Sequence, residues 1–557
     1  MTMVSLLRFP AAPPYPPAPS GRAPGTSGPA PWISSPRARG LVRLLLLAGM
    51  LATVGVAVPA TAQEVPLQGL DDFIEAGMAE WGIPGLGIAV VKDDQVVLAR
   101  GYGVLHREES RTVDEHTLFG IASVSKAFTA AAVGMLVDEG RLHWDDPVVR
   151  HLPEFRLYNP FVSETVTIRD LLSHRVGVGR MTGNRITWLP HRDRSDLVYR
   201  IRYLEPEQSF RNGYVYSNVM YMVAGEVVAA VSGMSWDDFI AERIFRPLGM
   251  TRSNTSVTAI AEGENAAWPH QEIGGEVVPI PRRNFDAVGA SASINTSVSE
   301  IIPWMRLHLG MTGEVDGVRL LSPEVMREMH RAQNRIPDGG PPGGLVSYGL
   351  GWQLSSFEGR RVSQHGGATD GMNTMLLLVP EENLGVIVTT NTFNNFMSAL
   401  GNRVLDRYLG IPDRPWDRMI RDGYEAQFAR VAAGRDSIHA ARVEGTSPSL
   451  PLDAYTGLFL DSLYAEAEVV LEDGALALRF WEDDTQSLDL EHWHFDTFRG
   501  HWRNPAQREK FVWFTRGEDG GIDALHVRWT LRPDLLQVGL YPASYTRTVT
   551  FHRADPR

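Results

Sequence analysis

The sequence predicts an α+β domain, built on one antiparallel sheet that a helical insertion interrupts, followed by a small all-β domain. Two apolar segments near the beginning, 87–92 and 95–101, flank the turn Asp93-Asp94 and predict a hairpin. Strand patterns return only after about residue 348, and helical patterns fill the interval. Because such an order is typical of a single interrupted sheet, we expect the intervening helices to pack against it.

Composition excludes several classes of protein. A length of 557 residues is too great for one domain. A formal charge of −13 argues against a nucleic-acid partner. Because the chain has no cysteine, disulfides, thiolate metal sites and a cysteine nucleophile are excluded. The chain has no His-Glu-x-x-His motif for metal-dependent hydrolysis, and we expect neither a metal nor a cofactor.

The first 62 residues predict a leader and a signal peptide. Residues 1–36 are rich in Pro, Ala, Ser and Gly and predict disorder. Three arginines between residues 37 and 43 then precede an apolar run, 44–58, and the motif Ala60-Thr61-Ala62. The run is shorter than the roughly 20 residues that a membrane span needs, although an uncleaved anchor is the alternative. We expect a periplasmic or secreted protein that begins near Gln63 and meets a membrane only through the signal.

The main domain, which we place at 63–415, has several elements with clear boundaries. An amphipathic helix is expected over 70–81, and an alanine-rich helix after Ser123 that Gly140 ends. Further helices begin at Ser235 and, with a capping box, at Ser297. The late strands are expected at 348–354, 361–365, 372–379 and 384–390, followed by a helix over 394–409.

A second domain is expected over 452–557, after a helix and linker at 416–451. Residues 445–451 contain Gly and Pro and predict a linker, and short segments of alternating apolar and polar residues follow. These segments predict a small sandwich or barrel; they are 466–471, 475–480, 511–514, 524–529, 536–540 and 546–551. His492 and His494 form a His-x-His pair, but no further ligand pattern is near, so a structural role is favoured over zinc binding.

The residues that point to chemistry are Ser123 and Lys126. They stand at i and i+3 on one helix, so their side chains share a face. A hydroxyl beside an amine that can lose its proton is a minimal nucleophilic pair, and the start of a helix favours a developing oxyanion. The alternative is an N-cap serine and a solvated surface lysine. Among 53 Lys and Arg residues only three are lysines, which favours a lysine chosen for its ability to deprotonate.

Two further motifs follow in order along the chain. Tyr216-Ser217-Asn218 precedes an apolar helix, and His365-Gly366-Gly367-Ala368 ends an expected strand. With Ser123-x-x-Lys126 they resemble the three motifs of the serine β-lactamase and penicillin-binding-protein superfamily, in its class C β-lactamase, D-aminopeptidase and carboxylesterase branch. The segments 167–177 and 246–250 resemble that family too, and the resemblance covers about 70–409. The tail, about 452–551, is similar through its stretch 490–496 to the lipocalin-like domain that follows many such hydrolases.

The resemblance implies a β-lactamase/transpeptidase-like fold and a role for each motif residue. Ser123 would attack a carbonyl and Lys126 would take its proton, while Tyr216 would pass a proton to the leaving group and activate the deacylating water. Asn218 would hold the substrate amide. The N–H groups of Ser123 and Ala368 would form the oxyanion hole. Gly366 and Gly367 would let the substrate lie against the strand edge.

His365 departs from the pattern, because penicillin-active members usually carry Lys there. A histidine is not a fixed positive charge at pH 7, so the anchor for a substrate carboxylate is weakened. This favours a peptidase acting near an amino terminus, or an esterase, over a potent β-lactamase. We expect a secreted serine hydrolase of amides or esters, on D-amino-acid peptides or cell-wall-type substrates. The alternative is a non-enzymatic peptide- or cell-wall-binding protein that retains the fold.

Overall fold

The computed structural model describes residues 66–179, 193–337, 345–480, 486–504, 507, 509–530 and 546–554. The predicted leader and signal, and the predicted strand 536–540, lie outside the described residues. Secretion therefore stays a prediction.

One antiparallel sheet of eight strands organises the first domain of the described chain. In spatial order the strands are β2 (Gln95–Gly103), β1 (Gly85–Lys92), β14 (Leu384–Thr390), β13 (Met372–Val379), β12 (Arg360–Thr369), β11 (Gln353–Phe357), β10 (Ser347–Tyr348) and β9 (Asn334–Arg335). The early hairpin pairs with the last strand of the sheet, since β1 lies beside β14. The interrupted antiparallel sheet predicted from the sequence is confirmed.

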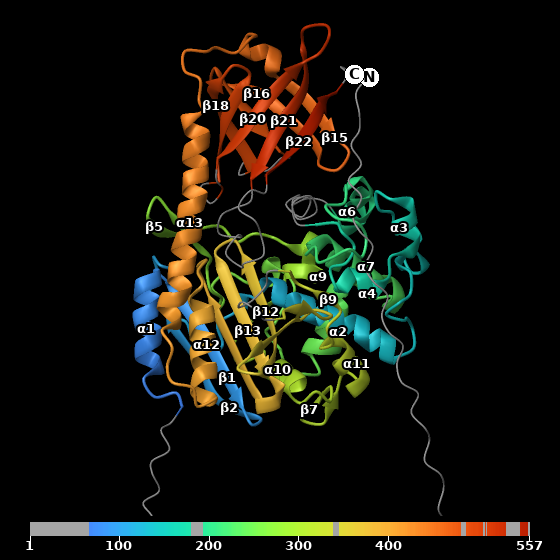
Figure 1. The fold of residues 1–557 in the computed structure, drawn as a ribbon, viewed down its shortest axis with the longest axis vertical. Helices are drawn as coiled ribbons and strands as arrows, with labels where there is room; N and C mark the ends of the chain where they lie inside the picture. The colour runs from blue at the N-terminus through green and yellow to red at the C-terminus, as the bar shows by residue number, and fades with distance from the viewer. Residues whose placement is uncertain are drawn as a thin grey trace, which may run out of the picture. The chain divides into compact units, whose positions relative to one another are not determined.

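Both faces of the central strands are buried. Along β1, Ile88 and Val90 pack into one hydrophobic cluster, whereas Ala89 and Val91 pack into another. Side chains alternate between the faces of a strand, so an almost continuous apolar run marks a strand covered on both sides. The helices α1 (Leu70–Trp81) and α12 (Phe396–Tyr408) cover the first face (Figure 1).

The helical insertion covers the other face. Its central members are α2 (Ser125–Asp138), α7 (Asn218–Ser232) and α10 (Ile302–Leu309), and α10 packs directly on β1, β13 and β14. Almost every residue of α2 is buried, because sheet and neighbouring helices surround it. The expected glycine follows its end, since Gly140 has a φ of 68°.

The remaining helices and short strands of the insertion complete this domain. They are β3 (Phe119–Gly120), α3 (Pro160–Thr165), α4 (Ile168–Leu172), α6 (Arg194–Arg200), α8 (Trp236–Ile240), β4 (His270–Ile273), β5 (Glu276–Pro279), α9 (Gly289–Ala292), β6 (Asn295–Thr296), β7 (Glu314–Val315), β8 (Val318–Arg319) and α11 (Pro323–Met329). Among the described helices, none is by itself long and apolar enough to cross a membrane. Within the part of the chain that the structure describes, one bent pair passes by length and composition, α7 with 236–245, at an angle of 78°.

The second domain is a closed antiparallel barrel that follows helix α13 (Trp416–Ala440). Its strands are β15 (Gly457–Asp461), β16 (Ala465–Glu472), β17 (Ala475–Arg479), β18 (Ser487–His494), β19 (Thr497–Trp502), β20 (Lys510–Arg516), β21 (Ile522–Thr530) and β22 (Thr546–Arg553). Each pairs with the next, and β15 pairs with β22 to close the ring. The aromatic rings of Tyr455, Phe459, Phe498 and Phe514 pack together in its core. The predicted all-β domain is confirmed as a barrel, while its lipocalin-like character and the domain boundaries stay predictions.

One strand differs from the sequence prediction, whereas the contacts of the His-x-His pair agree with the structural role favoured for it. The strand expected over 348–354 is two short strands, β10 and β11, because Gly351 takes a φ of 81° and reverses the chain between them. In the barrel, His492 and His494 each bond to backbone: His492 Nε2 lies 3.0 Å from the Phe495 carbonyl, and the Val443 N–H donates to His494 Nδ1. No group of three metal-ligating side chains occurs among the described residues.

Candidate active site

Ser123 lies where the chain enters the most buried helix. A 3-10 turn, Ala122–Val124, continues directly into α2. Ala122 has a φ of 47°, a left-handed conformation that is uncommon for a residue with a Cβ. Such strained backbone clusters at functional sites, where the surrounding structure holds it in place. Here it turns the chain sharply from β3 into the helix and leaves Ser123 only partly buried.

Lys126 is completely buried and points at the serine. Its Nζ lies 3.0 Å from Ser123 Oγ and donates to the Ser291 carbonyl at 2.9 Å. The same Nζ lies 4.8 Å from the centre of the Tyr216 ring. Burial excludes the alternative of a solvated surface cation. Burying a charged amine costs free energy, so a fully buried lysine beside a serine hydroxyl suits a functional role better than a surface one.

Tyr216 reaches the same oxygen from a separate element. Its hydroxyl lies 2.9 Å from Ser123 Oγ, so three predicted catalytic groups meet at one atom. The loop that carries Tyr216 ends at Ser217, and Asn218 is the first residue of α7. A nucleophile in contact with two groups that can carry protons is the arrangement that acyl transfer through a serine needs.

His174 orders the loop of Tyr216, although the sequence prediction did not include it among the site residues. The ring is fully buried, and its Nδ1 accepts the N–H of Ser217 at 3.1 Å. Its centre lies 4.3 Å from that of Tyr216 and 4.5 Å from that of Tyr348. His174 also has a left-handed φ of 59°. The only sequence signal for it was its place in the segment 167–177.

His365 is almost completely buried, unlike a side chain that is open to a substrate. It is 5 % exposed, its Nδ1 lies 2.8 Å from the Gly366 carbonyl, and its Nε2 lies 2.8 Å from the Tyr348 hydroxyl. A carbonyl can only accept, so Nδ1 carries the proton and Nε2 accepts from tyrosine. Burial raises the pKa of Tyr348 well above its ordinary value, which keeps that phenol a donor. Both ring nitrogens are thus engaged within the protein, and substrate contact by His365 stays a prediction.

Gly367 and Ala368 bring strand β12 against the start of the Ser123 helix. A Cβ on Gly367 would lie 2.1 Å from the Ile121 carbonyl oxygen, so only glycine allows this approach. Pairing between β11 and β12 begins at Gln364, and among the described residues β11 does not extend alongside the stretch from His365 to Thr369. Ala368 therefore follows Gly367 on a strand edge near the turn that carries Ser123, and its role as an oxyanion-hole donor stays a prediction.

A family model described as "Beta-lactamase" matches residues 70–410, more than half of the chain. The chain belongs to the beta-lactamase family. This β-lactamase-like family consists generally of serine hydrolases, which agrees with the Ser123, Lys126 and Tyr216 geometry. A second model, described as a domain of unknown function (DUF3471), matches residues 441–539, which include most of the barrel.

Similar proteins and solved structures are consistent with this family. An unguisins hydrolase of Aspergillus campestris is 27% identical over 430 residues, which span 73% of this chain and 78% of the relative. The octameric penicillin-binding protein homologue from Pyrococcus abyssi superposes with a TM-score of 0.56 at 22% identity, over 82% of this chain and 97% of that one. SurE superposes with a TM-score of 0.52 at 19% identity, over 88% and 99%. These two structures show the fold that the chain shares.

Proposed function

We propose that the protein is a secreted serine hydrolase that forms an acyl-enzyme on Ser123 and cleaves amide or ester bonds. The observation that carries the proposal is the meeting of Lys126 Nζ and the Tyr216 hydroxyl at Ser123 Oγ, at 3.0 and 2.9 Å. D-Amino-acid peptides and cell-wall-type peptides are the first substrates to test. The name of the fungal relative, an unguisins hydrolase, supports hydrolysis as the activity.

The proposed reaction has two halves. Ser123 Oγ bonds to the carbonyl carbon as its proton passes to Lys126, and the oxyanion accepts the N–H groups of Ser123 and Ala368. The bond to the leaving group then breaks, and that group takes a proton through Lys126 or Tyr216. In the second half Tyr216 activates a water, which attacks the ester and returns the proton to Ser123. Such oxyanion donors are typically worth about 3 kcal/mol each.

The experiment is covalent labelling of the mature protein. A fluorophosphonate or a fluorescent penicillin should label the wild type and leave Ser123→Ala unlabelled. Ser125→Ala is the matched control, because Ser125 is buried and its hydroxyl accepts the Ile294 N–H instead of facing the reactive group. Equal labelling of the wild type and Ser123→Ala would place the reactive nucleophile elsewhere, and an unlabelled wild type would reject the proposal in favour of a binding protein. N-terminal sequencing of exported protein tests the secretion part, with Gln63 as the expected first residue.

A further inference from the structure

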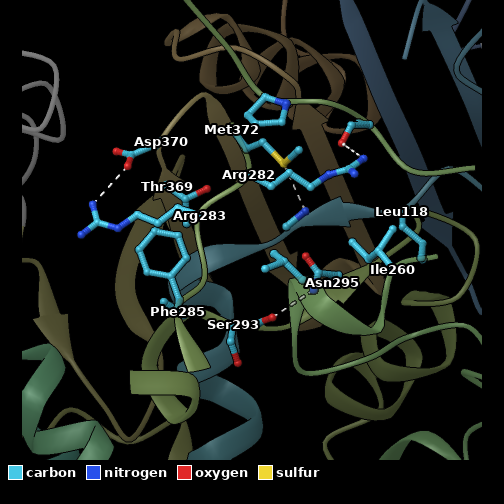
Figure 2. Close-up of a pocket in the computed structure, with 15 residues that line it drawn as sticks. Leu118, Ile260, Arg282, Arg283, Phe285, Ser293, Asn295, Thr369, Asp370 and Met372 are labelled. Carbon is cyan, nitrogen blue, oxygen red and sulfur yellow. Dashed lines mark hydrogen bonds and ion pairs between the residues drawn. The ribbon is translucent and has the colours of Figure 1, made fainter. Parts of the chain in front are cut away.

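A pocket lies among segments that adjoin the reactive residues in the sequence, and the reaction as described so far does not use it. It encloses about 500 Å³, counting the solvent at its mouth. In Figure 2 Arg282 and Met372 lie above it, Ser293 and Asn295 below it, and Arg283 with Asp370 to its left. Most of the other lining residues are apolar; they are Leu118, Val257, Ile260, Ala267, Pro269, Phe285 and Ala292. An apolar lining with a few polar groups is typical of a small-molecule site.

The elements that hold the reactive groups also form walls of this pocket. Gly120 lines it and precedes the Ala122–Val124 turn. Ala292 lines it and follows Ser291, whose carbonyl accepts from Lys126. Thr369 lines it and follows Ala368 on β12. A substrate held at Ser123 and lying along the edge of β12 would therefore extend into the pocket with one of its halves.

Arg282 is a partly buried cation without a counter-ion among the described residues. One of its terminal nitrogens donates to the carbonyls of Ala266 and Ala267, both at 3.0 Å, and its guanidinium lies over the Trp268 ring. The buried Nε has no acceptor in the described structure. Neighbouring Arg283, in contrast, lies 3.1 Å from Asp370. Burial lowers the pKa of Arg282, as expected for a desolvated cation, and the charges of Glu264 and Glu109 offset this only in part.

The guanidinium of Arg282 indicates which kind of ligand the pocket binds. A desolvated guanidinium is stabilised by a carboxylate, which matches its planar donors, and is destabilised by another cation. With Arg283 and Asp370 neutralising each other, the pocket has a net positive charge and walls that are mostly apolar. We propose that this pocket binds the acyl half of the substrate and selects an apolar chain that ends in a carboxylate, with Arg282 as its counter-ion. The proposal rests on the proposed hydrolase function and narrows its substrate class.

This carboxylate belongs to the acyl half and is held by Arg282, so its recognition does not depend on the substrate-carboxylate anchor considered for His365. The pocket also disfavours a free ammonium on the acyl half, so it argues against an aminopeptidase. During turnover the carboxylate stays intact: Ser123 Oγ bonds to the acyl carbon, the leaving alcohol or amine takes a proton, and water then releases the acid.

The test compares three p-nitrophenyl esters with the same six-carbon acyl chain. Hexanoate ends in a methyl group, adipate in a carboxylate and 6-aminohexanoate in an ammonium. For the wild type we expect kcat/KM for the adipate to exceed that for the hexanoate by at least about tenfold, the scale of one charge-assisted hydrogen bond. The ammonium ester should be the slowest. A methyl preference, an ammonium preference or three equal values would overturn the proposal.

Substitutions of lining residues test whether the preference for the carboxylate arises in this pocket. Arg282→Met should abolish the preference for the adipate, whereas Arg319→Met should keep it, since Arg319 is an exposed arginine outside the lining. Gly120→Ala provides a test that leaves Arg282 intact. Its new Cβ would lie 3.4 Å from Asn295 Oδ1 and 3.5 Å from Met372 Sδ, so it fits while narrowing the pocket. We expect it to slow the six-carbon esters more than p-nitrophenyl acetate. A carboxylate preference that survives Arg282→Met would overturn the assignment.

Fluorophosphonate labelling and acetate hydrolysis separate this proposal from the one on which it rests. If both are present in the wild type and the preference is missing, the pocket proposal fails while the hydrolase function stands. If both are missing, the hydrolase function fails and the pocket proposal fails with it.

Discussion

Two side chains from separate parts of the chain contact the hydroxyl of Ser123, and a strand packs against the turn that carries it. Lys126 reaches it from the same helix, Tyr216 from the loop before α7, and β12 lies against the turn that precedes it. His174 and Tyr348 support these groups in turn. His174 accepts the N–H of Ser217, next to Tyr216, and Tyr348 bonds to His365 on β12. Substitutions of these residues should therefore reduce the reaction rate more than they disturb the fold.

Lys126→Arg tests the role of the lysine as a base. Arginine keeps the charge and much of the length but does not give up its proton in a protein. We expect acylation, measured as the rate of fluorophosphonate labelling, to fall by at least about a hundredfold, the lower end for loss of general-base help. Because Lys126 is fully buried, a melting curve must accompany the rate. A folded variant with a near-normal rate would show that the lysine is only a structural cation.

His174→Ala tests whether this histidine positions Tyr216. The variant removes the acceptor for the Ser217 N–H and the ring against Tyr216, so we expect kcat to fall by about ten- to a hundredfold with little change in KM. His174→Asn should recover part of the loss, since Asn tolerates a left-handed φ and can accept the same hydrogen bond. Equal losses in kcat for both variants, or a loss confined to KM, would contradict a positioning role.

At the scale of elements, the site depends on how closely a strand and a helix approach each other. Strand β12 passes Ile121 at a distance that excludes any side chain on Gly367. Neighbouring Gly366 is not constrained in this way, because a Cβ there would find its nearest atom, Met375 Cε, at 3.6 Å. The two glycines look equivalent in the sequence and differ in the structure.

Gly367→Ala should therefore separate β12 from the helix start. We expect a loss of about 1–3 kcal/mol in the free energy of unfolding, typical of overpacking, together with slower acylation. Gly366→Ala is the matched control and should change stability by much less. Denaturant unfolding and labelling rates measure both quantities. Similar stabilities for the two variants would mean that the helix start moves aside without cost.

For the whole molecule, a buried histidine pair makes stability depend on pH. His308 Nδ1 lies 2.9 Å from His330 Nε2, and His330 Nδ1 lies 2.8 Å from Ser363 Oγ. Burial lowers the pKa of His330 to about 3 and that of His308 well below its ordinary value. Trp352 packs against both rings, and Arg361 is the charged group that acts on His330.

The sign of the effect follows from proton binding. Above pH 6.5 neither state binds a proton at these rings, so there is no penalty. Between pH 6.5 and 3 the unfolded chain is protonated and the native one is not, so stability falls as pH falls, by up to about 1.4 kcal/mol per pH unit and histidine. His330→Asn should reduce this slope in unfolding measured at several pH values, whereas substitution of the exposed His501 should not. An unchanged slope in His330→Asn would contradict the prediction.

Much of the fold followed from local pattern. The hairpin, α1, α12 and the strands β13 and β14 lie close to their predicted places, because apolar alternation and turn residues are local signals. The three motifs likewise pointed to residues that meet in space. No such signal marked three other features of the site. They are the hydrogen bond between His365 and Tyr348, the left-handed conformation of Ala122 and the carbonyl of Ser291 that accepts from Lys126. Each depends on packing between distant segments or on a backbone atom that every residue has.

The pairing of β1 with β14 has a consequence for biosynthesis. Gly85 donates its N–H to the side chain of Asn391 at 2.7 Å, across 306 positions of the chain. A ribosome must therefore complete nearly the whole first domain before β1 can gain its second neighbour. Until then the apolar hairpin has an open hydrogen-bonding edge, the kind of edge through which chains associate with one another. Folding of this domain should be slow for its size and should depend on keeping nascent chains apart.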